Sequence, residues 1–462
     1  MNQQNNKIEI MRDEPIPRAL LKLGIPTMVG MLVSALYNVV DAYFVSGLGT
    51  SEVGAVSIVF PISQIIIGIA MTFGSGAASY ISRLLGMGDG ERANKTASTA
   101  LFTSLAVGIT AIIISLLFLN QLLRGLGATD TILPHARAYA VIFIIGSIFN
   151  IFNVTMNNLV TAEGATKLTM SAMLIGGVLN CALDPIFIYP LKFGVAGAAI
   201  ATVISQSITS ILYLWFIFEK KGIIRISPKF FKPDRTIFGE IFKVGIPTLV
   251  FQILSSMAMG LTNTAASNYG DSAVAAMGIV TRILALGSYI VFGYMKGFQP
   301  LVGYNYGAKQ YDRLKKSISV SLIWSTCFCA ITGLLLFYIA PNILSLFSKN
   351  DIAMIEIGSN ALRVNSIMFA FFGFQMVYSS VFLALGKGRE GSILSISRQG
   401  IFFIPTILLL PLLLKLNGVI YAQPIADTLT ILLTLVFVMK INKELKGLKN
   451  LPSVINREEV FK

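Results

Sequence analysis

Long apolar stretches, separated by short polar segments, occupy most of the chain. Each stretch is long enough to cross a bilayer as a helix, which takes about 20 mostly apolar residues. The pattern therefore predicts an all-α integral membrane protein with twelve transmembrane helices. They cover about residues 19–46, 53–80, 96–120, 135–160, 168–190, 194–219, 240–268, 273–301, 316–340, 357–385, 392–413 and 417–440.

The sequence contains an internal repeat: its second half resembles its first half at an offset of 221 residues. Residues 22–29 return as 243–250 with Lys-x-Gly-Ile-Pro-Thr-x-Val in common, and Gly76 recurs as Gly297. Six helices fall in each half, so both halves enter the membrane from the same side. This predicts two six-helix lobes related by a parallel pseudo-twofold repeat, which is typical of secondary transporters. A duplicated scaffold without a transport role is the alternative.

The repeat and the loops divide the chain into five segments. They are an N-terminal segment (1–18), a first lobe (19–219), a linker (220–239), a second lobe (240–440) and a C-terminal tail (441–462). Lysine and arginine gather in alternate loops, including the linker and the tail, as the positive-inside rule describes. Both termini and the linker are therefore expected on the cytoplasmic side. The polar N-terminal segment does not resemble a signal peptide.

Composition narrows the class of function. Only 13% of residues are charged, against roughly 25% in soluble domains. The net charge of +14 could suggest a nucleic-acid partner, but its confinement to alternate loops favours membrane topology and contact with anionic lipid. The only histidine is His135, and the three cysteines lie inside predicted helices. We therefore expect no enzyme, catalytic residues, metal centre or cofactor.

Two carboxylates fall inside predicted helices of the first half, Asp41 in 19–46 and Asp184 in 168–190. An ionisable side chain within a membrane span is a functional hypothesis by default, because burying it in hydrocarbon is costly. Tyr37 and Asn38 precede Asp41 by four and three residues, so all three share one helical face.

Further polar residues accompany Asp184. Asn180 lies one turn before it, and Pro185 disturbs the helix directly after it. Thr202 and Gln206 are one turn apart in the next helix. These residues would form one polar cluster with Asp41 if their three helices meet. The repeat offset carries Asp41 to a threonine and Asp184 to a proline, so the carboxylates belong to the first lobe alone.

Two carboxylates close together in a site of low dielectric constant share a proton or bind a cation. Either behaviour suits an ion-coupled carrier, and a structural hydrogen-bonded pair is the alternative. Asn180, Thr202 and Gln206 could equally serve as contacts between helices.

Lys296, in the predicted helix 273–301, has the opposite charge. It could extend to the interface, pair with Asp427, or face a central cavity and repel cations. Met31 and Met173 are candidate lining residues, because flexible methionines suit a cavity that accepts many shapes, although methionine also fills cores.

Several motifs resemble the MATE (multidrug and toxic compound extrusion) family, within it the MepA-like and DinF-like bacterial branch. They are Val-Asp-Ala-Tyr-Phe-Val at 40–45, Leu-Asn-Cys-Ala-Leu-Asp-Pro at 179–185, Gly-Val-Ala-Gly-Ala-Ala at 194–199 and Gln-Pro-Leu-Val-Gly-Tyr-Asn-Tyr-Gly-Ala at 299–308. The resemblance covers residues 15 to 445. It implies a V-shaped carrier of the bacterial plasma membrane that exports cationic, lipophilic compounds in exchange for H⁺ or Na⁺.

In the DinF-like branch the cation site lies in the first lobe, and the resemblance assigns it here to Asp41, Asn180, Asp184 and Thr202. The substrate-cavity candidates are Tyr37, Asn38, Gln206, Lys296, Met31 and Met173. Lys296 departs from the MepA-like pattern, which has an acid in that region. The leading expectation is therefore a monomeric multidrug antiporter. A flippase for a lipid-linked precursor or an exporter of an anionic metabolite is the alternative, favoured by Lys296, Arg282 and Arg398.

Overall fold

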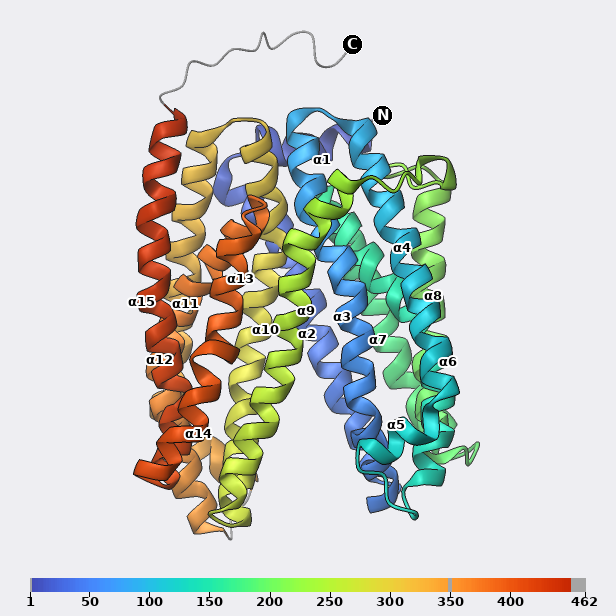
Figure 1. The fold of residues 1–462 in the computed structure, drawn as a ribbon, viewed down its shortest axis with the longest axis vertical. Coiled ribbons are helices and arrows are strands. Elements are labelled where there is room, and N and C mark those ends of the chain that lie inside the picture. The colour runs from blue at the N-terminus through green and yellow to red at the C-terminus, as the bar shows by residue number, and fades with distance from the viewer. Residues whose placement is uncertain (1, 348–350, 450–462) are drawn as a thin grey trace.

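The computed structural model describes residues 2–347 and 351–449. Two helical lobes draw together at the end where the N-terminus lies, here the junction end, and diverge toward the opposite, divergent end (Figure 1). The first lobe contains α2 (Ile16–Ser46), α3 (Thr50–Met87), α4 (Gly90–Leu117), α5 (Leu119–Gly125), α6 (Leu133–Ala162), α7 (Thr166–Ile188) and α8 (Gly194–Phe218). A linker with one 3-10 turn, η1 (Pro228–Phe230), leads to the second lobe.

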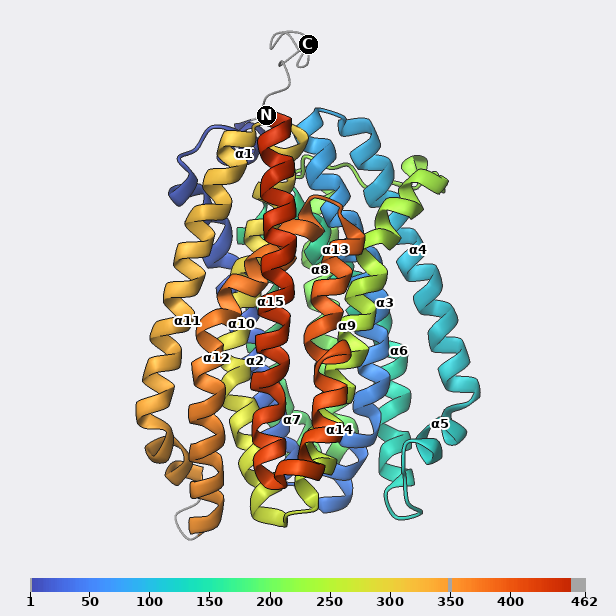
Figure 2. The ribbon, with the colours of Figure 1, turned by 60° about the vertical axis from the view of Figure 1, so that its left-hand side comes forward.

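The second lobe contains α9 (Arg235–Ser267), α10 (Asp271–Gly307), α11 (Tyr311–Phe347), α12 (Ile352–Ala384), α13 (Gly388–Ile396), the π-helical turn η2 (Ser397–Ile401), α14 (Phe403–Leu414) and α15 (Leu416–Lys449). Figure 2 shows α15 at the front of this lobe, between α12 and the broken helix that α13, η2 and α14 form. Of the predicted tail, residues 450–462 lie outside the described residues.

The twelve predicted spans are confirmed by twelve segments long and apolar enough to cross a membrane. Their bounds differ most at the junction end, where helices continue past the apolar stretch. The helix predicted over 53–80 runs to Met87 and stops at Gly88, whose φ of 78° ends the helix in the left-handed region. The next helix begins at once, because the Asp89 side chain accepts from the backbone N–H of Arg92 at 3.0 Å. Two helices were not predicted, α1 (Asn2–Arg12) and α5.

The most extensive contacts between the lobes are those of α2 with α10 and of α3 with α9, and α3 also contacts α10. Glycines bring these backbones into close contact. A Cβ on Gly245 in α9 would lie 2.0 Å from the carbonyl oxygen of Thr72 in α3, and one on Gly297 in α10 would lie 2.4 Å from that of Leu23 in α2. Any larger residue would hold the helices apart, so the repeated glycines permit the junction.

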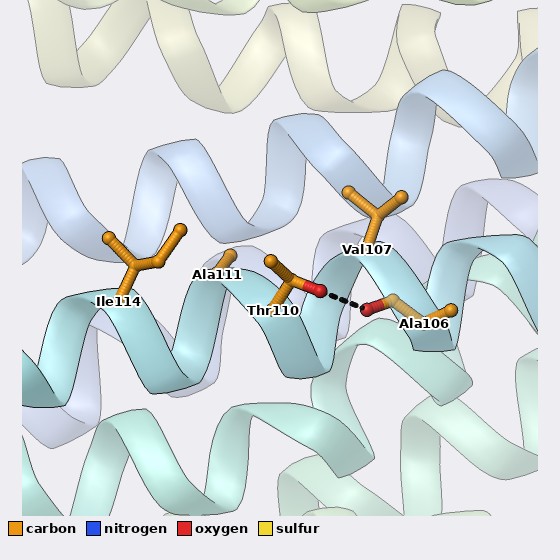
Figure 3. A pocket seen from close by; sticks show the side chains of 5 residues that line it. All are labelled: Ala106, Val107, Thr110, Ala111 and Ile114. Carbon is orange, nitrogen blue, oxygen red and sulfur yellow. Dashed lines mark hydrogen bonds between the residues drawn. The ribbon is translucent and has the colours of Figure 1, made fainter.

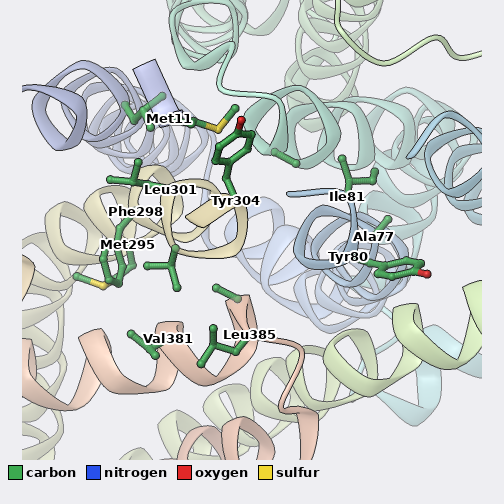
Figure 4. Close-up of a cluster of buried hydrophobic side chains, with 14 of the residues drawn as sticks. Met11, Ala77, Tyr80, Ile81, Met295, Phe298, Leu301, Tyr304, Val381 and Leu385 are labelled. Atoms are coloured by element: carbon green, nitrogen blue, oxygen red, sulfur yellow. The ribbon is translucent and has the colours of Figure 1, made fainter. Parts of the chain in front are cut away.

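Apolar and ionic contacts close the junction end. Phe298, Leu301, Ala77 and Ile81 belong to one fully buried core that crosses between the lobes (Figure 4). Nearby, the Arg83 guanidinium of α3 pairs with Glu240 of α9 at 2.8 Å.

Helix α1 lies across this end and contacts both lobes and the linker. In the first lobe, Lys7 pairs with Glu163 at 3.2 Å and donates to the carbonyl of Lys221 at 3.0 Å. Toward the second lobe, Met11 is fully buried and Arg313 donates to the carbonyl of Glu14 at 2.8 Å. The N-terminal segment therefore contacts both lobes at the junction end and holds them together there.

Candidate functional site

The four residues predicted to hold a coupling ion meet in the first lobe. Asp41 comes from α2, Asn180 and Asp184 from α7, and Thr202 from α8. The Asn180 amide donates to Asp184 Oδ1 at 3.1 Å and to Thr202 Oγ1 at 3.3 Å. The carboxyl groups of Asp41 and Asp184 lie within hydrogen-bonding reach of each other. We refer to these four side chains as the acidic cluster.

Local sequence explains how the cluster forms. Gly177 lets α2 approach α7, since a Cβ there would lie 2.9 Å from Val33 and 3.6 Å from Tyr37. Pro185 cannot donate to the carbonyl of Cys181, so this oxygen, one turn back in the same helix, lacks its helical donor. The result is a close pair of helices, with one backbone acceptor of α7 left without its helical donor.

Three oxygens of the cluster are buried and receive no hydrogen bond from any described residue: Asp41 Oδ1, Asn180 Oδ1 and Asp184 Oδ2. Asp184 is fully buried and Asn180 is 3% exposed. Buried acceptors without a donor are costly. A proton on a carboxylate, or a cation ligated by hard oxygen atoms, would satisfy them. The arrangement therefore fits H⁺ or Na⁺.

The other candidates of the first lobe lie at different distances from the cluster. Tyr37 adjoins it, since it packs near Gly177 and within electrostatic range of Asp41. Asn38 points away: its side chain is exposed and donates to the carbonyl of Ser34 at 2.6 Å. The backbone carbonyl of Gln206 accepts from Asn153 at 2.8 Å and from Ser210 at 3.0 Å, and contact of its side chain with the cluster stays a prediction.

The two methionine candidates belong to the packing of α2 and α7. The Met173 sulfur lies 2.7 Å from the position of a Cβ on Gly30, so this methionine fills the space beside the glycine. Met31 is half-buried on α2. Contact of either side chain with substrate stays a prediction.

Tyr139 of α6 was missed by the sequence analysis. Its side chain is 7% exposed, stacks on Phe143 and lies within electrostatic range of both Asp41 and Asp184. A tyrosine in an apolar helix normally indicates core packing, so no signal in the sequence singled it out.

The Lys296 side chain connects the two lobes. It neither extends to the membrane interface nor pairs with Asp427. From α10 it donates to Asn157 Oδ1 of α6, and the Asn157 amide donates to the buried Tyr213 hydroxyl at 3.1 Å. Asp427 pairs with Arg398 instead. Two of the three alternatives for Lys296 are thus wrong, and its effect on a substrate in the cavity stays a prediction.

A shallow surface depression of about 360 Å³ lies along the mostly exposed outer face of α4. Ala106, Val107, Thr110, Ala111 and Ile114 line it, and the Thr110 hydroxyl is bound to the Ala106 carbonyl of its own helix (Figure 3). It contains no ionisable group and is not the candidate site.

Comparisons with known proteins agree with this geometry. The family model MatE matches residues 26–186 and 247–409, one segment in each lobe. Multidrug export protein MepA of Staphylococcus aureus is 29% identical over 440 residues, which are 94% of this chain and 96% of that protein. The protein of the same name from Staphylococcus saprophyticus is 29% identical over 422 residues, 91% of this chain and 93% of that one.

Solved structures are similar over nearly the whole chain. A crystal structure of MATE in complex with MaL6 has a TM-score of 0.90 and 29% identity, covering 96% of this chain and 99% of that one. An outward-facing multidrug resistance MATE transporter of the MOP superfamily has a TM-score of 0.89 and 30% identity, covering 96% and 98%. A MOP superfamily transporter from Pyrococcus furiosus, described as having a binding pocket of reverse polarity, also scores 0.89 at 30% identity, covering 96% and 99%.

Proposed function

Because this chain belongs to the MATE family of multidrug transporters, we propose that it is an antiporter that exports organic, cationic and lipophilic compounds in exchange for H⁺ or Na⁺. The family consists of transporters, not enzymes, and the chain is a multi-pass membrane protein with twelve spans. The acidic cluster is the proposed site of the coupling ion.

The observation that carries this proposal is the set of three unsatisfied oxygens between α2 and α7. Two carboxyl groups within hydrogen-bonding reach cannot both remain charged cheaply in a site of low dielectric constant. One proton or one monovalent cation neutralises the excess charge. Asn180 already donates to Asp184 and Thr202, so its amide oxygen is left to face the ion.

Helix α2 offers a route from the ion to the lobe junction. It carries Asp41 in its later half and, about four to five turns earlier, the residues that pack against α10: Leu23, Gly24 and Met28. An ion that draws Asp41 toward Asp184 therefore acts on a helix that belongs to both the cluster and the junction. Transport requires only that the ion bind more tightly in one lobe arrangement than in the other.

We propose that the junction end faces the cytoplasm of a bacterial cell. The basic loops, the linker and α1 gather at this end, which the positive-inside rule assigns to the cytoplasm. The lobes then diverge toward the outside, the arrangement in which substrate leaves. One chain supplies both lobes, so we expect a monomer surrounded by lipid.

The alternative, an exporter of an anionic or lipid-linked compound, receives less support. It needs cationic side chains that are open to an anion. Lys296 is bound to Asn157, and Arg398 is paired with Asp427 at 2.9 Å. Two of the three cations that favoured this alternative therefore have partners within the described chain, whereas Arg282 of α10 is exposed.

The test is efflux of a fluorescent lipophilic cation from vesicles containing the purified protein, under an imposed pH gradient and then an imposed Na⁺ gradient. Asp184→Asn and Asp41→Asn should each reduce gradient-driven efflux by about tenfold or more, as expected for the loss of a coupling free energy of 1–3 kcal/mol. Asp130→Asn is the matched control, because Asp130 is exposed and its ion pair among the described residues is with Arg124 at the divergent end. Wild-type efflux by the Asp184 variant would refute the assignment, and the gradient that drives efflux identifies the ion.

A further inference from the structure

The second lobe contains an ion pair at a place related by the repeat to the acidic cluster. Arg398 Nε donates to Asp427 Oδ1 at 2.9 Å, and its Nη2 donates to Oδ2 at 3.4 Å. The Gln423 amide adds a third donor to Asp427, at 2.8 Å. The Arg398 and Asp427 side chains are 14% and 11% exposed, and the guanidinium lies 4.6 Å from the centre of the Phe372 ring.

The repeat places this pair in the counterpart of the ion site. Asp427 and Gln423 lie in α15, the duplicate of α8, and the 221-residue offset carries Thr202 of the acidic cluster onto Gln423. Arg398 lies in the π-helical turn of the duplicate of α7, which supplies Asn180 and Asp184 to the first lobe. The two polar sites thus occupy equivalent helices of the two lobes.

The sites differ in whether their acceptors are satisfied. In the first lobe three buried oxygens have no donor among the described residues. In the second lobe both oxygens of Asp427 receive hydrogen bonds, two of the three from a cation. The π-helical turn admits an additional residue into the helix, as such turns often do at functional sites, and presents Arg398 to α15.

We infer that Arg398 acts as a tethered cation in the second lobe's counterpart of the ion site, and that a neutral residue at this position would open a binding site for H⁺ or Na⁺ at Asp427. The inference rests on the proposed function of the acidic cluster. In the natural chain, Arg398 confines ion coupling to the first lobe, because its guanidinium is always charged and does not dissociate from the protein.

The physical basis is the cost of an uncompensated buried charge. Removing one partner of a buried ion pair is strongly destabilising, because the remaining charge has lost its counterion. Without Arg398, Asp427 would keep only the Gln423 amide as a donor. A proton or a small cation would then restore neutrality, as proposed for Asp184.

The experiment counts bound cations in purified protein, as H⁺ taken up in a pH titration and as ²²Na⁺ retained at equilibrium. The proteins are the wild type, Arg398→Gln, the charge-preserving Arg398→Lys and the double variant Arg398→Gln/Asp427→Asn. Over roughly pH 9 to 5, where the ammonium of Arg398→Lys stays protonated, we expect Arg398→Gln to take up about one more H⁺, or to retain about one more Na⁺, than the wild type and Arg398→Lys. The double variant should lose this gain. The titration that shows the gain identifies the cation. Equal counts in the folded Gln and Lys variants would overturn the inference.

Poor folding of Arg398→Gln would itself be informative. If the double variant folds, the single variant should be rescued by low pH or by Na⁺, because a ligand that binds only the folded state stabilises it. A single variant that neither condition rescues, beside a folded double variant, would overturn the inference. Adding Asp184→Asn to the Gln and Lys variants separates the two proposals. The gain from Arg398→Gln should persist there, whereas a wild-type cation count that does not depend on Asp184 would refute only the acidic cluster.

Discussion

Replacing Gly245 with alanine should shift the protein away from the arrangement in which the junction end is closed. The new Cβ would lie 2.0 Å from the Thr72 carbonyl oxygen, a backbone atom that cannot rotate away. Contacts of Cβ atoms under 3.0 Å essentially do not occur, so α3 and α9 would have to separate by about 1 Å. Overpacking of this kind costs about 1–3 kcal/mol, and the strain disappears in any arrangement that parts these helices.

A penalty of this size changes the ratio of the two arrangements by roughly 5- to 150-fold. Gly260→Ala is the matched control, since Gly260 lies in the same helix and has no atom within 4 Å of its added Cβ. Both substitutions raise helix propensity equally, so only the contact with α3 distinguishes them.

The assay is pulsed electron paramagnetic resonance between spin labels on the two lobes. Suitable positions are Leu117, at the end of α4, and Leu346, near the end of α11, which are 71% and 79% exposed. The native cysteines, Cys181, Cys327 and Cys329, are first replaced by alanine. Gly245→Ala should move the distance distribution toward shorter separations at the divergent end. A distribution identical to that of Gly260→Ala would refute the view that glycine contacts hold the junction end closed.

Two further predictions concern buried charges. Lys296→Gln keeps a donor for Asn157 but removes the positive charge. At an effective dielectric constant of about 20, the charge repels a cationic substrate about 8–16 Å away by roughly 1–2 kcal/mol, so affinity for that substrate should rise by about tenfold. Unchanged binding of a fluorescent cation would leave Lys296 a purely structural role. Burial raises the pKa of Glu163 despite opposition from Lys7 and the amide N–H groups of Ile224 and Ile223, so the folded state binds the proton more tightly than the unfolded state does. Thermal stability should therefore fall as the pH rises from the ordinary glutamate value of about 4.3 through the raised pKa, and Glu163→Gln should remove that component of the pH profile; a variant profile that still parallels the wild type would contradict the assignment.

The sequence predicted the acidic cluster because its signals are local. Asn180 and Asp184 are one turn apart on a helix, and acids inside an apolar stretch are rare enough to stand out. The repeat then showed that Asp41 and Asp184 belong to one lobe. What could not be predicted is how α2, α6, α7 and α8 pack. That packing brings Tyr139 to the cluster and leaves Asn38, only three residues from Asp41, on an exposed face.

Helix α1 at the junction end and the Arg398–Asp427 pair could not be predicted from the sequence, for physical reasons. Helix α1 has no apolar periodicity, and its Met11 becomes buried only because both lobes are present to cover it. Arg398 and Asp427 are 29 residues apart. The polar residues Ser397, Arg398 and Gln399 of the π-helical turn interrupt the apolar stretch, but they do not indicate which distant residue they contact. Pairing between distant residues depends on tertiary contacts that helix periodicity does not encode.

The two lobes share a fold but carry different side chains at equivalent positions. In the position of Asp41 the second lobe has Thr262, whose hydroxyl is already bound to the Ala258 carbonyl of its own helix at 2.8 Å. In place of Asp184 it has Pro405. A group whose partners belong permanently to the protein cannot report an ion concentration, because only a ligand that exchanges with solution can shift an equilibrium between arrangements. If the protein is ion-coupled, its driving force must therefore act through α2 and α7, and the second lobe serves as the frame against which they move.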